Sequence, residues 1–521
     1  MNLRIFPHST SGLAHREADA GADHSARPAP RRAGTRPGVA LAIMLGAQLM
    51  IILDATVVNI ALPHIQAGLH FSATSLSWVM NGYTLTFGGL LLLGGRAGDI
   101  LGRRRMFLAG IGLFTVASLA GGLAPNAGVL LAARAVQGVG GALASPAVLA
   151  LVVSGFPEGR ERIRALAIYS GVVTAGGSLG LVLGGLITQW ASWRWVLFVN
   201  VPIGIAVAVL TPMFVTETPR VPGRFDLPGA VTSTAGVAAL VYAFIRAASD
   251  GWGNHVAIAA FAVAAVLLVA FVLNERRAPQ PITPLRLFAS AARSGSFIAR
   301  LLVVAGMFGM FFFLTQFLQD VLGFGALRAG IAFLPMTLLL FAVSRLAPRL
   351  MPRVGGWRLM MLGMLPVVAG MAWLSRVSPD TTYWSGVFGP MVLLGAGMGV
   401  VFVPLTTASL AGVAPQDSGA ASSMVNVMQQ LGGSVGLAVL VAVFGTATRD
   451  SQAHPVAGLS AAAFHQHVLA HGMSTAFLLA AIFDLAALLV IATLLRERRP
   501  AVPSSPAELA DDTVPAGALP D

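Results

Sequence analysis

Long apolar runs alternate with short polar connections along most of the chain. A helix needs roughly 20 mostly apolar residues to cross the hydrocarbon core of a bilayer. The pattern therefore predicts an all-α membrane protein with fourteen transmembrane helices. The predicted spans lie at 39–61, 76–95, 106–124, 128–153, 165–189, 195–215, 228–247, 256–273, 297–319, 330–348, 358–375, 385–408, 419–445 and 473–494.

Three short motifs of the first half of the chain recur in the same order in the second half. This repetition predicts two homologous six-helix bundles, at 38–215 and 297–495, with two inserted helices and a cytoplasmic linker at 216–296 between them. The paired motifs are Arg96-x-x-Asp99-x-x-Gly102 with Arg349-x-x-Pro352-x-x-Gly355, Gly141-Ala-Leu-Ala-Ser-Pro146 with Gly399-Val-Val-Phe-Val-Pro404, and Gly176-Gly-Ser-Leu-Gly180-Leu181 with Gly432-Gly-Ser-Val-Gly436-Leu437.

Composition agrees with a chain that resides in lipid. Hydrophobic residues make up 56% and charged residues 10%, against about 25% charged residues in soluble domains. The chain has no cysteine, which excludes disulfides and thiolate metal sites. Its polar ends, 1–37 and 496–521, are predicted to be disordered cytoplasmic tails.

The net charge of +12 is explained by topology rather than by nucleic-acid binding. All 33 basic residues are arginine, and 25 of them fall in the tails and in alternate connections between the predicted spans. Such a bias marks the cytoplasmic side of a membrane protein. Both termini are therefore predicted to be cytoplasmic.

Several motifs resemble those of one transporter family. The charged island from Gly94 to Arg105, Gly-Gly-Arg-Ala-Gly-Asp-Ile-Leu-Gly-Arg-Arg-Arg, resembles the loop between spans two and three of major facilitator superfamily transporters. In span one, the segment Leu-Asp-Ala-Thr-Val-Val-Asn-Ile-Ala-Leu-Pro at 53–63 is similar to the signature of the fourteen-span drug/proton antiporters. The segments 193–204 and 318–335 resemble further connections of that family, so the resemblance covers about 38–495.

The resemblance implies a secondary transporter in the cytoplasmic (inner) membrane. Such a carrier exports hydrophobic or amphipathic compounds, including drugs and antibiotics, in exchange for protons by alternating access. One departure is Leu181, where the family commonly has a proline after the glycine equivalent to Gly180. The alternative is a narrow exporter of one endogenous metabolite, such as an antibiotic or siderophore. Whether a periplasmic adaptor extends the path across an outer envelope stays open.

The residues argue against an enzyme and against a metal protein. Without lysine the chain cannot contain a Walker-type ATP-binding loop, so an ion gradient is expected to supply the energy. The resemblance implies that this is a proton gradient, and no cofactor is expected. No Ser/His/Asp or Cys/His arrangement is apparent, and no predicted span contains a His-x-x-x-His pair. His465, His467 and His471 are assigned to a solvated external loop at 446–472, because no cysteine or paired acid accompanies them.

Three charged residues inside predicted spans are candidates for proton coupling or substrate binding. Asp54 could load a proton on one side and release it on the other, could bind a cationic substrate, or could serve as a helix-packing carboxyl bonded to neighbouring hydroxyls. Arg134 could act as a fixed cation that biases a nearby acid or substrate, or could be satisfied by carbonyls. Asp484 could be a second protonation site, could contact a cationic substrate, or could be a neutral acid bonded locally in a peripheral span.

The charged island is predicted to form an inner gate that holds the outward-facing state closed. Asp99 is expected to cap an adjacent helix N-terminus and to pair with an arginine. The same arginines would in any case determine topology. The gate candidates are Gly95, Arg96, Asp99, Gly102, Arg103 and Arg104.

Two further groups of residues are singled out by their place in the spans. A glycine group in span five is predicted to allow close helix packing; it consists of Gly176, Gly180, Gly184 and Gly185. Four amides could line a substrate cavity or could bond neighbouring helices together; they are Asn59, Gln137, Gln429 and Gln430.

Overall fold

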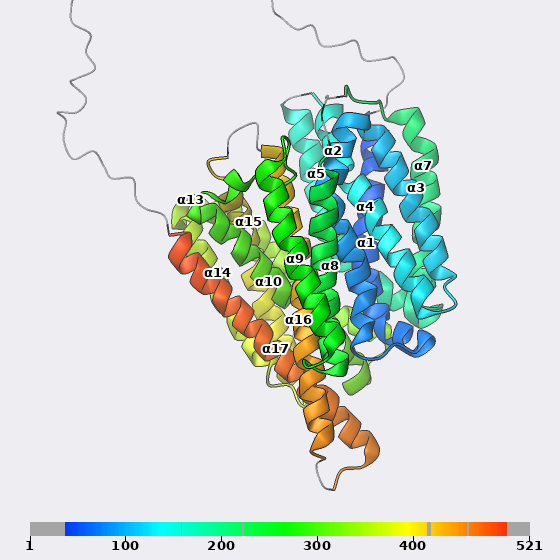
Figure 1. Ribbon diagram of the computed structural model, residues 1–521, viewed down its shortest axis with the longest axis vertical. Helices are drawn as coiled ribbons and strands as arrows, with labels where there is room; N and C mark the ends of the chain where they lie inside the picture. Colours follow the sequence, from blue (N-terminus) through cyan, green and yellow to red (C-terminus); the bar gives the residue numbers. More distant parts are fainter. Residues whose placement is uncertain are drawn as a thin grey trace, which may run out of the picture.

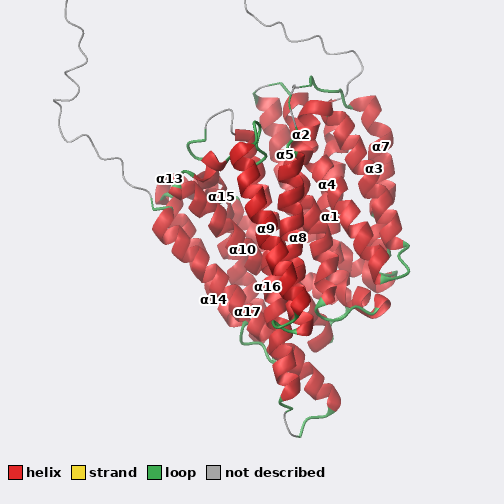
Figure 2. Cartoon of the chain, in the orientation of Figure 1, coloured by secondary structure: helices red, strands yellow, loops and turns green. Residues whose placement is uncertain are grey.

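The computed structural model is all-helical over the residues that it describes, which confirms the predicted fold class (Figure 2). Both predicted tails, apart from Pro37 and Arg496, lie outside the described residues. The described residues are 37–157, 159–220, 223, 225–413, 418–455 and 458–496.

The helices follow the predicted spans closely. The first bundle and the inserted pair consist of α1 (Pro37–Leu69), α2 (Trp78–Leu101), α3 (Arg103–Gly122), α4 (Ala127–Gly155), α5 (Arg160–Trp190), α6 (Trp195–Phe198), α7 (Asn200–Phe214), α8 (Leu227–Asp250) and α9 (His255–Arg277). The second bundle consists of α10 (Ala291–Gln316), α11 (Ala326–Ala332), α12 (Leu334–Ser344), α13 (Ala347–Val354), α14 (Gly356–Leu374), α15 (Phe388–Leu410), α16 (Ser418–Ala453) and α17 (Ala461–Leu494). Short helical turns at Ser75–Ser77, Phe317–Val321 and Tyr383–Val387 extend α2, α10 and α15, and another lies at Leu285–Phe288.

Thirteen helical segments of the described chain are long and apolar enough to cross a membrane. The remaining predicted span, 165–189, corresponds to the 31-residue helix α5, whose stretch Leu179–Trp190 is apolar. Together these agree with the predicted fourteen spans. The protein is therefore a multi-pass membrane protein.

The two halves of the chain lie side by side (Figure 1). Helices α1 to α7 form one group, α10 to α17 form the other, and α8 and α9 lie in front between them. Helix α1 begins and α17 ends at the same end of the bundle, here called the tail end. The opposite end, where α16 and α17 project beyond their neighbours, is called the hairpin end.

The inserted helices are attached to the second bundle at the hairpin end. Arg449 of α16 donates to the carbonyl oxygens of Ala247 and Ala248 in the last turn of α8. The Ala247 oxygen also accepts from the backbone nitrogen of Gly251 (3.0 Å), and a cation is favourable near the carbonyls at a helix C-terminus. Gly445 lets α16 approach this turn, because a Cβ there would lie 2.6 Å from the Ala248 oxygen. Arg449 thereby couples the inserted pair to α16.

The projecting hairpin corrects the predicted loop at 446–472. Helix α16 continues to Ala453 and α17 starts at Ala461, with Ser460 accepting a hydrogen bond from the backbone of Ala463 (3.2 Å). Hydropathy identified only the lipid-buried part of each helix, because a helix that leaves the bilayer becomes polar without unwinding. His467 and His471 thus lie one turn apart on α17, but the described residues contain no cluster of three metal-ligating side chains.

The glycines of α5 face two different helices. A Cβ at Gly180 would lie 1.8 Å from the hydroxyl of Thr56, and one at Gly184 would lie 2.8 Å from the Val57 carbonyl oxygen, both on α1. Gly185 instead faces α11, where a Cβ would lie 2.6 Å from the Ala326 oxygen. Helix α5 therefore packs within its own bundle through one glycine row and against the opposite bundle through Gly185.

Candidate functional site

Asp54 lies in the middle of α1 and is almost completely buried, with 1% of its surface exposed. Its Oδ2 forms an ion pair with Nη1 of Arg134 on α4, and both side chains are inaccessible to solvent. The structure thus brings together two of the three charged residues that were predicted as coupling or substrate candidates. Each supplies the opposite charge that makes burial of the other tolerable.

Amide groups from two helices complete the shell of the carboxylate. Oδ1 of Asp54 accepts from Nε2 of Gln137 (3.1 Å) and from Nδ2 of Asn200 at the start of α7 (2.9 Å). Gln137 also donates to the hydroxyl of Ser118 on α3 (2.6 Å) and accepts from Arg134 (2.9 Å). The carboxylate therefore joins α1, α4 and α7 directly and α3 through one further side chain.

Arg134 is also fixed by α2. Its Nε donates to the backbone oxygen of Val79 (3.1 Å), and its guanidinium lies 4.5 Å from the centre of the Tyr83 ring. Its Nη2 has no hydrogen-bond partner in the structure. The ion pair is thus contacted by groups of α2 and α7 as well as by Gln137 of α4, and the Nη2 group of Arg134 is still available as a donor. Asp54, Arg134, Gln137, Asn200, Ser118 and Tyr83 are called the Asp54 cluster below.

Three members of the Asp54 cluster were not selected from the sequence. Asn200 stands in a segment that resembles the family, Phe-Val-Asn-Val-Pro at 198–202, and a polar residue at the start of an apolar helix was the available signal. Ser118 and Tyr83 carry hydroxyl groups of kinds that are frequent in membrane helices. Nothing in their local sequence distinguishes them from packing residues.

The other amides lie at the boundary between the two bundles. Asn59 donates from Nδ2 to the Phe311 oxygen (3.1 Å) and to the Thr315 hydroxyl (3.0 Å), both on α10. Gln430 of α16 is buried and packs against α2, where a Cβ at Gly88 would lie 2.4 Å from its own Cβ. The Asn59 hydrogen bonds correspond to the helix-bonding alternative, whereas the role of Gln430 stays a prediction. Gln429 is half-buried beside Gln430.

Asp484 lies apart from the Asp54 cluster. It is completely buried on α17, and neither carboxyl oxygen has a hydrogen-bond partner. Its oxygens face α10, where a Cβ at Gly306 would lie 3.2 and 3.3 Å from them. The locally bonded acid that the sequence suggested as one alternative is therefore not observed. Its role as a second protonation site stays a prediction.

The charged island lies at the tail end and contacts its own half and the linker. Asp99 pairs with Arg103 one turn later (3.0 Å), as predicted, and Arg96 donates to Gln280 of the linker (2.7 Å). Among the described residues, no hydrogen bond joins Arg96, Asp99, Arg103 or Arg104 to helices α10–α17. Gly102 has a φ of 111°, which suits a glycine at the sharp turn into α3. Gly95 has only an ordinary contact, 3.7 Å from its position for a Cβ to Pro146.

The predicted helix cap comes from a different acid. Glu217, not Asp99, accepts from the backbone nitrogens of Arg104 (2.9 Å) and Arg105 (3.2 Å) in the first turn of α3. Gly102 permits this approach, because a Cβ there would lie 2.9 Å from the Glu217 carboxyl carbon. The expectation that Asp99 caps a helix is therefore wrong. Its carboxylate is occupied by Arg103, whereas Glu217 reaches the free N–H groups from the end of α7.

Replacing Glu217 with alanine should loosen the first turn of α3. Loss of a capping acceptor costs about 1 kcal/mol, which corresponds to about fivefold faster amide exchange at this turn. Hydrogen-exchange mass spectrometry of the peptide that contains Arg104 and Arg105 measures this change. Asp99→Ala is the matched control and should leave that peptide unchanged. Faster amide exchange in Asp99→Ala and not in Glu217→Ala would show that Asp99, not Glu217, caps α3.

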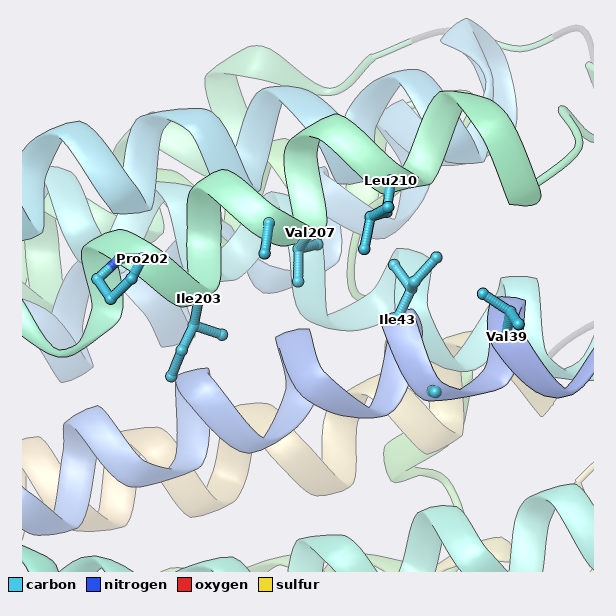
Figure 3. A pocket seen from close by; sticks show the side chains of 8 residues that line it. Val39, Ile43, Pro202, Ile203, Val207 and Leu210 are labelled. Carbon is cyan, nitrogen blue, oxygen red and sulfur yellow. The ribbon is translucent and has the colours of Figure 1, made fainter.

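An open apolar groove lies between α1 and α7 and is separate from the Asp54 cluster (Figure 3). Its volume is about 510 Å³, and none of its lining residues is polar or belongs to the cluster. Such a surface at membrane depth suits hydrocarbon rather than a polar or charged ligand. The groove is lined by Val39, Ala42, Ile43, Pro202, Ile203, Ala206, Val207 and Leu210.

Comparison with known proteins identifies the family. The profile of the Major Facilitator Superfamily matches residues 44–437. The chain belongs to this superfamily. Membership confirms the family that the charged island and the span-one motif indicated, and it identifies the protein as a membrane transporter.

Curated relatives in the superfamily match most of the chain. The puromycin resistance protein pur8 of Streptomyces alboniger is 43% identical over 413 residues, which cover 78% of this chain and 82% of that protein. The cephamycin export protein CmcT of Amycolatopsis lactamdurans is 42% identical over 419 residues, covering 80% and 86%. Among solved structures, an auto-inhibited peptide transporter of the POT family covers 90% of this chain and 99% of its own, with a TM-score of 0.63 and 16% identity. At that identity the likeness shows the fold alone.

Proposed function

We propose that this superfamily member exports hydrophobic or amphipathic compounds, antibiotics among them, across the cytoplasmic membrane in exchange for protons. Relatives at 43% and 42% identity are named for antibiotic resistance and antibiotic export. The arginine bias supports an orientation in which the tail end is cytoplasmic. Export would then carry substrate from the tail end towards the hairpin end.

The observation that carries the proton-coupling part is the buried pair of Asp54 and Arg134. An arginine keeps its charge, whereas a carboxyl can be neutralised by a proton. Protonation of Asp54 would weaken its attraction to Arg134, while Gln137 and Asn200 could still donate to the carboxyl. Because this carboxyl joins α1, α4 and α7, its proton state would alter the packing of the first bundle. That is the link between proton binding and alternating access which antiport requires.

A narrow exporter of one compound is the second candidate, and the names of the relatives favour it. The two relatives above are each named for one antibiotic, whereas the multidrug resistance protein Stp of Mycobacterium tuberculosis is 34% identical. The range of substrates is therefore a separate question from proton coupling, and one assay can address both.

Everted vesicles with a respiratory proton gradient test the proposal. Puromycin, ethidium, an uncharged aromatic antibiotic and an apolar carboxylate are added in turn, and a lumenal pH dye reports proton release. Release with several compounds would support a multidrug antiporter, and release with one would support the narrow exporter. Substrate uptake with no proton release, or no response in vesicles shown to contain the folded protein, would contradict proton-coupled export. Vesicles without the protein are the baseline.

A further inference from the structure

A second buried arginine lies in the other bundle and has no acidic partner. Arg300 of α10 is 4% exposed, and its Nη2 donates to the hydroxyl of Thr406 on α15 (2.5 Å). Its guanidinium lies 5.5 Å from the centre of the Phe402 ring. Its Nε is buried without a hydrogen-bond partner, and none of the ion pairs among the described residues includes it.

The contrast with Arg134 indicates that Arg300 is not there for stability. Arg134 is neutralised by Asp54 and donates to a backbone oxygen and an amide. Arg300 has one neutral oxygen and one aromatic face, which do not compensate a full charge at low dielectric. Charged residues of this kind inside membrane segments usually mark a functional path. The uncompensated charge of Arg300 and its Nε–H group without a partner are the features expected of an anion-binding site.

The position of Arg300 on α10 places it on the boundary between the bundles. Phe311 and Thr315, which contact Asn59 of the first bundle, lie eleven and fifteen residues further along α10. At about 100° per residue, these positions fall within about 60° of Arg300 around the helix. One turn before Arg300, Phe297 shares a hydrophobic cluster with Leu91 of α2. Arg300 therefore lies along the face of α10 that meets the first bundle.

Other charged groups near α10 do not neutralise this site. Asp484 approaches α10 at Gly306, six residues from Arg300, which corresponds to a face turned by about 120°. Asp54 is occupied by Arg134 in the opposite bundle. Arg300 consequently leaves a net positive charge on the side of α10 that borders the first bundle.

We propose that Arg300, with Thr406 and the ring of Phe402, binds an anionic oxygen group of the transported compound. The inference rests on the proposed export function and narrows its substrate class to apolar molecules that carry a carboxylate or an enolate. A guanidinium matches such a group because its N–H donors form a planar fork. The partly buried side chains of Met307 and Phe311 lie on the same side of α10 and would contact the apolar body.

Equilibrium binding to the purified full-length protein in nanodiscs tests this site without any proton gradient. The probes are 1-pyrenebutyrate and 1-pyrenebutanamide, which share one aromatic body and differ in the carboxylate. Energy transfer from the eight tryptophans to pyrene reports binding, after subtraction of empty nanodiscs. The wild-type protein should bind the acid more tightly than the amide.

Arg300→Gln should weaken binding of the acid by about tenfold to a hundredfold and leave the amide within about twofold. Arg300→Lys should retain part of the preference, because it keeps the charge but loses the fork. Arg345→Gln is the matched control, since Arg345 also lies over a phenylalanine ring, at 4.3 Å from the centre of Phe341, but is exposed. If Arg300→Gln left the ratio of the affinities for the acid and the amide unchanged, the proposal would be overturned. Equal binding of both probes by the wild-type protein, or no measurable binding of either, would also overturn it.

Thermal unfolding without ligand provides the second readout. If the charge serves binding, Arg300→Gln should unfold at the same or a higher temperature than the wild type, whereas Arg134→Gln should unfold at a lower one. A decrease in Arg300→Gln as large as in Arg134→Gln would assign Arg300 to packing and overturn the proposal. Intact acid preference with no proton release in vesicles would leave this site standing and contradict only the proton coupling.

Discussion

Asp54→Asn should reduce substrate-dependent proton release in everted vesicles to the level of vesicles without the protein. Asparagine has nearly the same shape as aspartate and can still bond Gln137 and Asn200, but it cannot exchange a proton. The lumenal pH dye measures the loss directly. Asp380→Asn makes the same chemical change at an exposed acid and should leave proton release unchanged.

The substitution also leaves Arg134 buried without its counter-charge, so a folding defect must be separated from a coupling defect. Removing one partner of a buried ion pair costs about 3–5 kcal/mol. The double variant Asp54→Asn/Arg134→Gln removes both charges and should recover much of the thermal stability without recovering proton release. If folded Asp54→Asn still releases protons with substrate, the proposal is contradicted. Asp484 would then be the next candidate for proton coupling.

The spans could be predicted because the bilayer imposes one requirement on every helix, an apolar stretch of about 20 residues. The same requirement made Asp54, Arg134 and Gln137 conspicuous, since a polar side chain in a span needs a reason to be there. Their mutual contacts could not be predicted. Asp54 and Arg134 are 80 residues apart in the chain, and only the packing of α1 against α4 brings them together.

Contacts that depend on packing account for the other differences. Glu217 reaches the start of α3 from 113 residues later in the chain, so no local pattern around Asp99 could reveal the actual cap. Asn200 looked like part of a family motif, and its hydrogen bond to Asp54 follows from where α7 begins. Beyond the bilayer, the polar turns of α16 and α17 lack the apolar signal that identifies a span. Sequence patterns therefore identified polar residues whose burial in a span costs free energy. The residues that they contact became known only from the structure.

The two buried arginines suggest that the two bundles have different functions, proton binding in the first and substrate binding in the second. In the first bundle, Arg134 is paired with Asp54, whose carboxylate joins α1, α4 and α7, so proton binding and helix packing are tied together there. In the second bundle, Arg300 has no acidic partner among the described residues and lies on the face of α10 towards the boundary. A carrier built in this way would sense the proton in one half and the substrate in the other. Movement between the halves would then be the step that couples them.

Gly185→Val should open the contact between the bundles at the hairpin end. Valine cannot fit where a single Cβ would lie 2.6 Å from the Ala326 backbone oxygen, and overpacking typically costs about 1–3 kcal/mol. We therefore expect Thr315, which is buried at the boundary between the bundles beside Asn59, to become more accessible from the hairpin end by about tenfold. Because the native chain has no cysteine, Thr315→Cys can serve as the sole reporter for a membrane-impermeant maleimide. Labelling rates in intact cells measure the change.

Gly177→Val is the matched control, since it makes the same substitution on α5 at a position where a Cβ would meet nothing within 4 Å. Its labelling rate should equal that of the reporter alone. Equal rates in Gly185→Val and Gly177→Val would show that the α5–α11 contact does not hold this end closed. Labelling that increases in everted vesicles instead of cells would place the hairpin end in the cytoplasm and contradict the proposed orientation. An increase confined to intact cells, together with slower export, would identify Gly185 as the position at which the two bundles close on the outer side of the membrane.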